Sequence, residues 1–307
     1  MRKTKMMSCN LCPRACGVSR EPGETGVCGE TRQLRIARAA LHFWEEPCIS
    51  GSKGSGTVFF SGCQMKCIFC QNSPIATGDI GKVIENERLS EIFFELKEKG
   101  ANNINLVTPD HFLPQIVRAI ERARAQGFDL PFVYNTGSYV TVDALKQLEG
   151  LISVYLPDFK YFDSRKSLAY AKAEQYPQVA KLAIAEMVRQ VGEPRFYERG
   201  EETLIERGVI VRHLLLPGGL GDAKQIVRYL HETYGDRIYI SLMNQYTPGE
   251  GVRNHPVLSK RVKKRDYDSL VDYAIALGVE QAYIQEGETA KDSFIPAFNY
   301  EGVEKQQ

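Results

Sequence analysis

The fold is decided by residues 57–72, which read Thr57-Val58-Phe59-Phe60-Ser61-Gly62-Cys63-Gln64-Met65-Lys66-Cys67-Ile68-Phe69-Cys70-Gln71-Asn72. The apolar run at the start predicts a buried strand, and three cysteines follow on one loop with the spacing Cys-x3-Cys-x2-Cys. A [4Fe–4S] cube needs four thiolates for saturation, so a loop that offers three leaves one iron open. An open iron can hold another molecule by its oxygen and nitrogen atoms. A zinc loop or a chance group of buried thiols is the structural alternative.

The spacing of Cys63, Cys67 and Cys70, with aromatic Phe69 before the last cysteine, resembles the signature of radical S-adenosylmethionine (SAM) enzymes. The resemblance implies a [4Fe–4S] cluster on these three thiolates and SAM chelated to the open iron, with Phe69 among the cofactor-binding residues. It also implies that an electron from the reduced cluster splits the sulfonium of SAM and produces a 5′-deoxyadenosyl radical.

The length, the net charge and the distribution of apolar residues limit the class of protein. The chain has 307 residues and a net charge of +1, so no strong field favours nucleic acid or a membrane surface. No stretch reaches the roughly 18 apolar residues that a membrane span needs. We therefore expect a soluble, cytoplasmic protein. Its cysteines fall mainly into two tight groups, which favours metal ligation over disulfides.

The second group of cysteines lies in residues 1–56 and consists of Cys9, Cys12, Cys16 and Cys28. Prolines and glycines surround it, and large apolar side chains are few. This segment therefore needs a cross-link, such as a bound metal, in order to fold. Four thiolates can close around one zinc ion or around a second iron–sulfur cluster, and the sequence leaves both open. Cys48 stands alone and is interpreted as a plain thiol.

Residues 57–290 alternate apolar strands with amphipathic helices, which predicts parallel pairing. The resemblance implies an α/β fold, a partial (β/α)6 TIM-like barrel, with the cysteine-rich segment before it and a tail over 291–307. An insert over 161–208 has two helical stretches and a possible hairpin, with no chemistry assigned. The expected strands are 57–60, 103–108, 131–135, 152–156, 209–216 and 237–242, with a short possible strand at 282–284.

Polar residues follow the expected strands at the end where barrels carry their chemistry. Within the superfamily the chain most resembles the activating enzymes of glycyl-radical enzymes, such as pyruvate formate-lyase activase. By that resemblance Asn135, Thr136 and Asp158, with the carbonyl of Leu156, face SAM and hold a monovalent cation. Asn135 replaces an aspartate of the family, which removes one charge from that site. The alternative for Asp158 is a structural pair with Lys160.

Two other strand ends carry candidates. Thr108-Pro109-Asp110-His111 stands where the activases have Gly-Gly-Glu, so Thr108, the Pro109 carbonyl and Asp110 are expected near the amino group of SAM, with His111 toward substrate. Arg212 and His213 point to opposite faces of their strand, so only one can line the barrel. We expect Arg212 at SAM and His213 in the core. Asn244, Gln245 and Tyr246 are expected at the mouth.

The leading functional hypothesis is an oxidoreductase that abstracts a hydrogen from a protein or peptide, as an activase does. A radical SAM enzyme for a small metabolite, and an iron–sulfur electron carrier, are the alternatives. The carrier is disfavoured because it would want a saturated cluster on a small fold. A flavodoxin- or ferredoxin-type electron donor is the expected partner. The basic residues 260–265 are either a solvated helix approach or its docking site.

Overall fold

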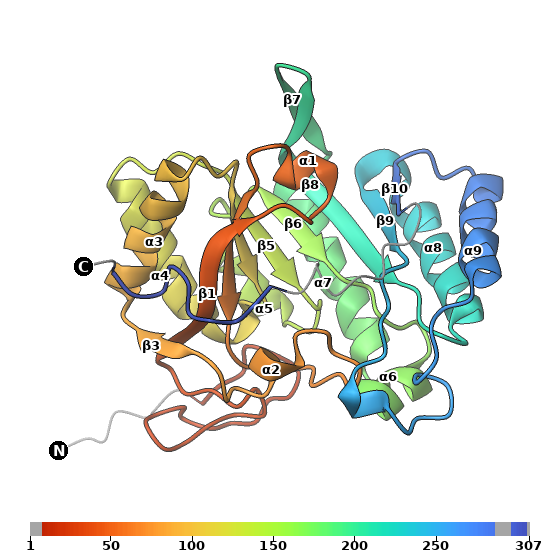
Figure 1. Cartoon of the computed structure of the whole chain (residues 1–307), viewed down its shortest axis with the longest axis horizontal. Helices are drawn as coiled ribbons and strands as arrows, with labels where there is room; N and C mark the ends of the chain where they lie inside the picture. The colour runs from red at the N-terminus through yellow and green to blue at the C-terminus, as the bar shows by residue number, and fades with distance from the viewer. Residues whose placement is uncertain (1–7, 286–295, 306–307) are drawn as a thin grey trace.

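The computed structural model describes residues 8–285 and 296–305 and has a mixed α/β architecture around one large sheet (Figure 1). The end of the expected barrel at 290, and residues 291–295 and 306–307 of the expected tail, lie outside the described residues. Strands β2, β4, β5, β6, β8, β9 and β10 pair in parallel in that order. The sheet runs from β10 at one edge to β3 at the other and does not close, so the prediction of a partial barrel is confirmed.

The strands occupy the following residues: β1 Leu34–His42, β2 Ser55–Phe60, β3 Lys82–Ile84, β4 Ile104–Val107, β5 Phe132–Thr136, β6 Val154–Pro157, β7 Arg195–Arg199, β8 Glu202–Leu214, β9 Tyr239–Met243 and β10 Ala282–Ile284. The central strands are buried along their whole length, as expected of parallel strands covered on both faces.

Helices cover the outside of the sheet (Figure 1). The apolar side chains between sheet and helices form the main core. The α-helices are α1 Pro47–Ser50, α2 Ser73–Ala76, α3 Asn86–Glu98, α4 Leu113–Ala125, α5 Val142–Lys146, α6 Ser164–Ala171, α7 Tyr176–Val191, α8 Leu220–Tyr234 and α9 Lys264–Leu277, with 3-10 turns at Asp110–Phe112, Gly235–Arg237 and Glu250–Val252. In the part of the chain that the structure describes, no helix has the length and apolar character to cross a bilayer.

Three features differ from the sequence-based expectation. Strand β1 was not predicted; it pairs antiparallel with β2 and with β3 and so joins residues 34–42 to the main sheet. Strand β8 begins at Glu202, well before the predicted 209, because it first pairs with β7 in the hairpin that projects in Figure 1. The third feature is Asp222: its residue type and its place after the 209–216 strand favour the N-cap of the next helix, but it lies inside the first turn of α8, after Gly219 at the N-cap. Its carboxylate instead accepts the backbone N–H groups of Phe162 and Asp163.

The N-terminal segment, residues 8–33, contains no helix or strand. Figure 1 shows it as loops beside α2, at the end of the barrel where the parallel strands finish. It is joined to the barrel by backbone hydrogen bonds from Cys63 N–H to the Cys28 carbonyl and from Thr141 N–H to the Leu11 carbonyl. The segment therefore packs directly beneath the loop that carries the three central cysteines.

Candidate active site

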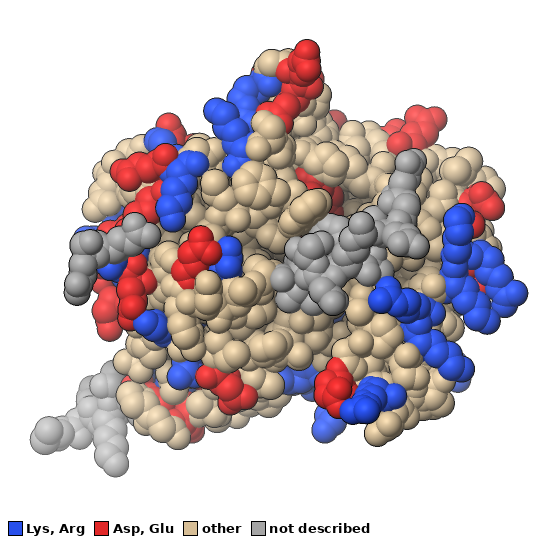
Figure 2. Space-filling view, viewed as in Figure 1, with Lys and Arg blue, Asp and Glu red and all other residues tan. Residues whose placement is uncertain are grey.

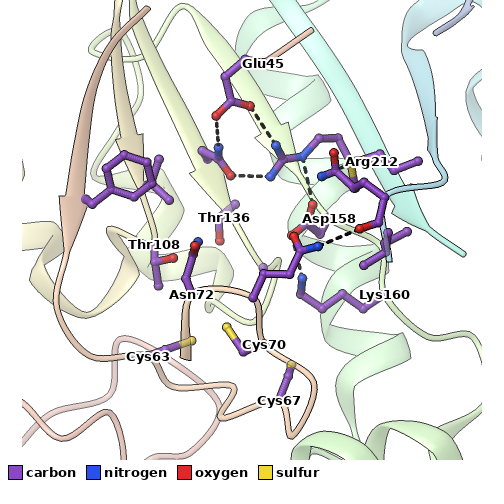
Figure 3. A pocket seen from close by; sticks show the side chains of 18 of the residues that line it. Glu45, Cys63, Cys67, Cys70, Asn72, Thr108, Thr136, Asp158, Lys160 and Arg212 are labelled. Atoms are coloured by element: carbon purple, nitrogen blue, oxygen red, sulfur yellow. Dashed lines mark hydrogen bonds and ion pairs between the residues drawn. The ribbon is translucent and has the colours of Figure 1, made fainter. Parts of the chain in front are cut away.

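One cavity of about 460 Å³ runs through the barrel from the three-cysteine loop toward the β1–α1 connection. It is lined at one end by Cys63, Cys67 and Cys70 and toward the other by Glu45 and Glu46. Figure 3 shows the three thiols at one end and Glu45 at the other, with Asp158, Lys160 and Arg212 between them. Side chains at the strand ends therefore lie between two chemically different regions.

The three-cysteine loop is fixed by contacts from the N-terminal segment. Gly62 has a φ of +79°, and a Cβ there would lie 2.5 Å from Glu30 Cγ and 2.8 Å from the Cys28 carbonyl. Only glycine permits both the left-handed backbone and this close approach. The Arg14 guanidinium donates to the Gln64 carbonyl at 3.0 Å. It also donates to the Ala171 carbonyl at 2.7 Å, which ties the loop to the end of α6.

Helices on the other side of the loop complete its support. Lys66 has a φ of +54°, and its ammonium group donates to the Ala76 carbonyl of α2 at 2.8 Å. The Ile68 N–H donates to the Tyr170 carbonyl of α6. Phe69 is buried and packs edge-on against Tyr161, Tyr170 and Tyr246. The loop thus holds its shape through side chains and backbone that are not cysteines.

The thiols themselves have the surroundings of iron–sulfur ligands. The Met65 N–H donates to Cys63 Sγ at 3.4 Å, and the Tyr161 hydroxyl donates to Cys67 Sγ at 3.7 Å. Such hydrogen bonds to sulfur are among the features that tune iron–sulfur clusters. Burial raises the pKa of all three thiols, to about 12 for Cys70. Deprotonated thiolates here therefore need a positive partner, and a metal cluster is one.

Metal geometry separates single ions from clusters. Within residues 8–285 and 296–305, no group of three or more His, Cys, Asp or Glu side chains has the geometry to hold a single metal ion. Cys63, Cys67 and Cys70 line one end of the cavity together and two of their sulfurs accept hydrogen bonds, which is the donor set and environment that an iron–sulfur cluster takes. In the N-terminal segment two thiols lie close to Gly26. A Cβ built on that glycine would be 3.1 Å from Cys16 Sγ and 3.5 Å from Cys28 Sγ.

Arg212 is the centre of a buried polar network between the strands. Its guanidinium donates to Asp158 Oδ1 at 3.0 Å, to Glu45 Oε2 at 3.0 Å and to Asn135 Oδ1 at 2.6 Å. Lys160 donates to the other oxygen of Asp158 at 2.7 Å. A monovalent cation would have to displace these donors, so the structure does not supply a vacant cation site at Asn135 and Asp158.

The charges in this network stabilise one another. Burial alone would raise the pKa of Asp158, but Arg212 and Lys160 outweigh it and the pKa is lowered. Burial alone would lower the pKa of Lys160, but Asp158 and the thiol of Cys67 raise it instead. Lys160 therefore remains an ammonium group beside the thiol loop. The pair with Lys160 that the sequence offered as the structural alternative for Asp158 is therefore present, and both residues also line the cavity.

Asp110 does not reach the cavity, contrary to the expectation that it contacts SAM. It is fully buried, and its oxygens accept from Gln64 Nε2 at 2.6 Å, Tyr134 Oη at 3.0 Å and Thr136 Oγ1 at 2.7 Å. Thr136 lines the cavity, but its hydroxyl is turned to Asp110. Asp110 therefore connects the thiol loop, through Gln64, to the end of β5.

The neighbours of Asp110 also differ from expectation. The Pro109 carbonyl accepts the Phe112 N–H in a 3-10 turn and so is already engaged. His111 is buried with Nε2 at 2.6 Å from the Ser61 carbonyl, and burial lowers its pKa to about 3, so it does not face substrate. Thr108 does line the cavity, with a φ of +57° that is strained for a β-branched residue.

The ends of β8 and β9 divide their residues between cavity and core. Arg212 lines the cavity, whereas His213 is buried with Nδ1 at 2.7 Å from the Phe159 carbonyl. Gln245 lines the cavity and its carbonyl accepts from Gln71 of the thiol loop at 2.8 Å. Tyr246, expected at the mouth, is buried, and its hydroxyl donates to the Leu258 carbonyl.

Sequence reasoning missed the two glutamates of the β1–α1 connection. Glu45 is 167 positions from Arg212, and no motif or periodicity links them. The only signal was a pair of adjacent acids, Glu45-Glu46, between Trp44 and Pro47. Cys48 was interpreted as a plain thiol; it is buried in α1, and burial raises its pKa to about 12.

Comparison with known proteins adds sequence and fold relatives. A family model described as the radical SAM superfamily matches residues 57–230. The chain is 25% identical over 287 residues to the uncharacterized protein MJ0674 of Methanocaldococcus jannaschii, which covers 92% of this chain and 78% of that protein.

Solved structures share the fold at low identity. A radical SAM methyltransferase from Sphaerobacter thermophilus superposes with a TM-score of 0.50 at 16% identity, over 75% of this chain and 66% of that one. SuiB of Streptococcus suis gives a TM-score of 0.50 at 14% identity, over 76% of this chain and 48% of that one. The chain thus spans no more than two thirds of either structure, and the likeness concerns the barrel.

Proposed function

Because this chain belongs to the radical SAM superfamily, we propose that it cleaves SAM reductively and removes a hydrogen atom from a polypeptide, as glycyl-radical activases do. The observation that carries the proposal is the end of the cavity formed by Cys63, Cys67 and Cys70, with hydrogen-bond donors on two of the sulfurs. A [4Fe–4S] cluster held there with SAM would supply a 5′-deoxyadenosyl radical. The rest of the chemistry is positioning and exclusion of water.

The residues that would contact SAM are those that line the cavity near the thiols. They are Phe69, Thr108, Asn135, Asp158 and Arg212. Arg212 and Asp158 are held rigidly by their mutual hydrogen bond and by their other partners, so they would give SAM a cavity wall that does not rearrange when it binds. Thr136 and Asp110 would act behind them, by fixing Gln64 of the thiol loop.

The N-terminal cysteines Cys9, Cys12, Cys16 and Cys28 are proposed to hold a second metal centre, zinc or iron–sulfur, around which the thiols would have to close, because no three ligands among the described residues are arranged around a single ion. Burial raises the pKa of Cys12 to about 12, so a thiolate there needs a positive partner. The segment has no helix or strand to shape it without a ligand. Its contacts with Gly62 and Gln64 suggest that the metal would also brace the thiol loop.

The electron donor is proposed to dock on the basic stretch 260–265. Figure 2 shows Lys and Arg side chains gathered over α9 and the chain that leads into it. The same connection approaches the thiol loop, because a Cβ on Gly251 would lie 2.5 Å from the Ile68 carbonyl. An acidic donor would therefore find positive charge near the centre that it reduces. Lys260→Glu with Lys263→Glu should slow reduction, most clearly at low ionic strength.

The shape and the charges of the cavity bear on the class of substrate. A polypeptide is supported by the open sheet, since the cavity is lined both by β10 residues (Tyr283, Ile284) and by the β1–α1 connection (Trp44). A small metabolite is the second candidate, because Lys160 and Arg212 make the cavity more charged than the sequence suggested. Both cations are already paired with carboxylates, which disfavours an anionic metabolite.

The experiment that tests the proposal follows deuterium. The reconstituted protein, a reductant and SAM are incubated with protein and small-molecule fractions of a fully deuterated cell extract. Deuterium should appear in 5′-deoxyadenosine with the protein fraction. Transfer from the small-molecule fraction alone would replace the polypeptide by a metabolite, and no 5′-deoxyadenosine from any fraction would refute radical SAM chemistry here.

A further inference from the structure

The connection between β1 and α1 inserts two adjacent glutamates into the cavity. Glu45 is fully engaged: Oε1 accepts from Asn105 at 3.0 Å and from Asn135 at 3.4 Å, and Oε2 accepts from Arg212 at 3.0 Å. Its contacts come from β4, β5 and β8, so it ties the connection to the barrel wall. Glu45 is thereby a structural carboxylate, and its neighbour must be considered separately.

Glu46 has a different environment. Glu46 is 8% exposed and lines the cavity. Its carboxyl group accepts a hydrogen bond from the side chain of Ser241 on β9. Its second oxygen, Oε2, is buried and accepts no hydrogen bond from the described residues. A buried carboxylate oxygen without a donor is costly, and the cost is relieved when a donor arrives. Glu46 is thus an acceptor in the cavity wall that lacks a donor.

The charged side chains that line the cavity also distinguish Glu46 from the others. Among the described lining residues, the carboxylates are Glu45, Glu46 and Asp158, and the cations are Lys160 and Arg212. Both cations form ion pairs with Asp158 or Glu45. His42 also lines the cavity, but burial lowers its pKa to about 4, so it is neutral near pH 7. Glu46 has neither of these ion pairs: burial raises its pKa and Arg212 only counteracts this, so a cation bound at its free oxygen would stabilise the ionised carboxylate.

We propose that Glu46 is a specificity residue whose free oxygen binds an ammonium or guanidinium group of the substrate. The proposal rests on the proposed function for the existence of a substrate, and it adds that the substrate carries a cation. A charged N–H donor and a buried carboxylate form one of the stronger hydrogen bonds in proteins. A lysine or arginine side chain, an amino terminus, or a small amine has the required chemistry.

The position of Glu46 favours the substrate over SAM as the source of that cation. Figure 3 places Glu45, the preceding residue, at the end of the cavity away from the thiols, with Arg212 between Glu45 and the thiols. Glu46 contacts Ser241 on β9. It also contributes to the raised pKa of Tyr283 on the edge strand β10. It therefore lies toward the open edge of the sheet, where a substrate can enter.

The test uses three probes of equal length: n-butylamine, n-butylguanidine and n-butanol. Their binding to the reconstituted, SAM-loaded protein is measured by calorimetry for the wild type, Glu46→Gln, Glu46→Asp and the exposed control Glu98→Gln. The cationic probes should bind the wild type about tenfold more tightly than butanol, as a hydrogen bond to a charged acceptor predicts. That ratio should fall to about one in Glu46→Gln and persist in Glu46→Asp and Glu98→Gln.

Two results would overturn the proposal. One is a wild type that binds the amines and butanol equally; the other is a preference that survives in Glu46→Gln. SAM affinity and 5′-deoxyadenosine formation are measured on the same variants. They should be unchanged in the exposed control Glu98→Gln, and in Glu46→Gln a loss of SAM affinity as large as the loss of cation preference would assign Glu46 to the cofactor instead. Wild-type protein that makes no 5′-deoxyadenosine would count against the proposed function, while the probe ratio would still judge Glu46.

Discussion

The two sides of the candidate site are built in different ways. On the barrel side, parallel strands place Asn135, Asp158 and Arg212 through backbone ladders and then lock them together with side-chain hydrogen bonds. On the N-terminal side, residues 8–33 have neither helix nor strand and are held by turns and a few contacts to the barrel. The thiol loop lies between them and touches both.

The comparison distinguishes residues that the fold holds in place from residues that need a ligand to hold them in place. Strand residues keep their places because a buried ladder and an apolar core already fix them. A loop segment with few apolar residues has no such source of order, and the metal centre proposed for residues 8–33 would supply it. Cluster assembly and SAM binding should therefore respond differently to changes on the two sides.

The largest effect is expected from the N-terminal side. Replacing Cys9, Cys12, Cys16 and Cys28 together by Ser would remove the proposed metal centre, and metal binding contributes on the order of 10 kcal/mol to the folding of such a segment. Amide hydrogen exchange in 8–33 should become fast, and the metal content should fall, while the barrel keeps its protection. Cys48→Ser is the control thiol, buried but outside both groups. Unchanged protection of 8–33 in the fourfold variant would remove the distinction between the two sides.

The next effect is expected on the barrel side, at Asp158. Asp158→Ala leaves Arg212 and Lys160 without their shared carboxylate and should lower the free energy of unfolding by about 3–5 kcal/mol, as loss of one partner of a buried pair does. SAM affinity should fall as well. Asp163→Asn is the matched control, because its partner Arg165 is exposed and surface pairs contribute about 0–1 kcal/mol. Equal losses in both variants would contradict the account of the network.

The pH dependence of the same residue has a defined sign. The pKa of Asp158 is lowered in the folded protein because Arg212 and Lys160 outweigh burial. Its contribution to stability is therefore fully present above the unfolded value of about 3.9 and is lost as the pH falls through the lower folded pKa. Urea unfolding should give a difference between wild type and Asp158→Asn that shrinks below about pH 4. A difference that grows on acidification would reverse the assignment.

Gly62 tests the junction of the two sides. Gly62→Ala places a Cβ 2.5 Å from Glu30 and 2.8 Å from the Cys28 carbonyl at a φ of +79°. We expect a loss of about 2–5 kcal/mol from overpacking and strain, with lower cluster content. Gly127→Ala has a similar φ of +84° but open space around it, so strain alone should cost about 1–2 kcal/mol. Equal effects in thermal unfolding would mean that the N-terminal segment does not press on the thiol loop.

The smallest effect is expected at Thr108. Its φ of +57° is strained, so Thr108→Gly should raise the free energy of unfolding by about 1 kcal/mol after the larger entropy of the unfolded glycine is subtracted. Thr233→Gly, on an exposed position inside α8, should instead destabilise by about 0.5 kcal/mol. Calorimetry measures both. If Thr108→Gly also lowers the free energy of unfolding, the positive φ of Thr108 does not strain the backbone.

The sequence predicted the parts of the site that follow from periodicity and spacing. Alternating strands and helices indicated the unclosed barrel, and Arg212 and His213 separated to cavity and core as strand alternation requires. Strand β1 was missed because its alanines carry little strand signal, although Ala37, Ala39 and Ala40 are buried. Glu45 and Glu46 were missed because their partners lie on distant strands, and only the folded barrel brings them together.

The central claim is that the loop of Cys63, Cys67 and Cys70 is where SAM is cleaved. The most direct measurement is 5′-deoxyadenosine formed by anaerobically reconstituted, reduced protein in the presence of SAM, for wild type and for the Cys63→Ala, Cys67→Ala, Cys70→Ala triple variant. The wild type should form it. The triple variant should keep its fold and the metal of the proposed N-terminal centre yet form no 5′-deoxyadenosine, because the barrel does not depend on these thiols. A triple variant that still produces 5′-deoxyadenosine would contradict the account.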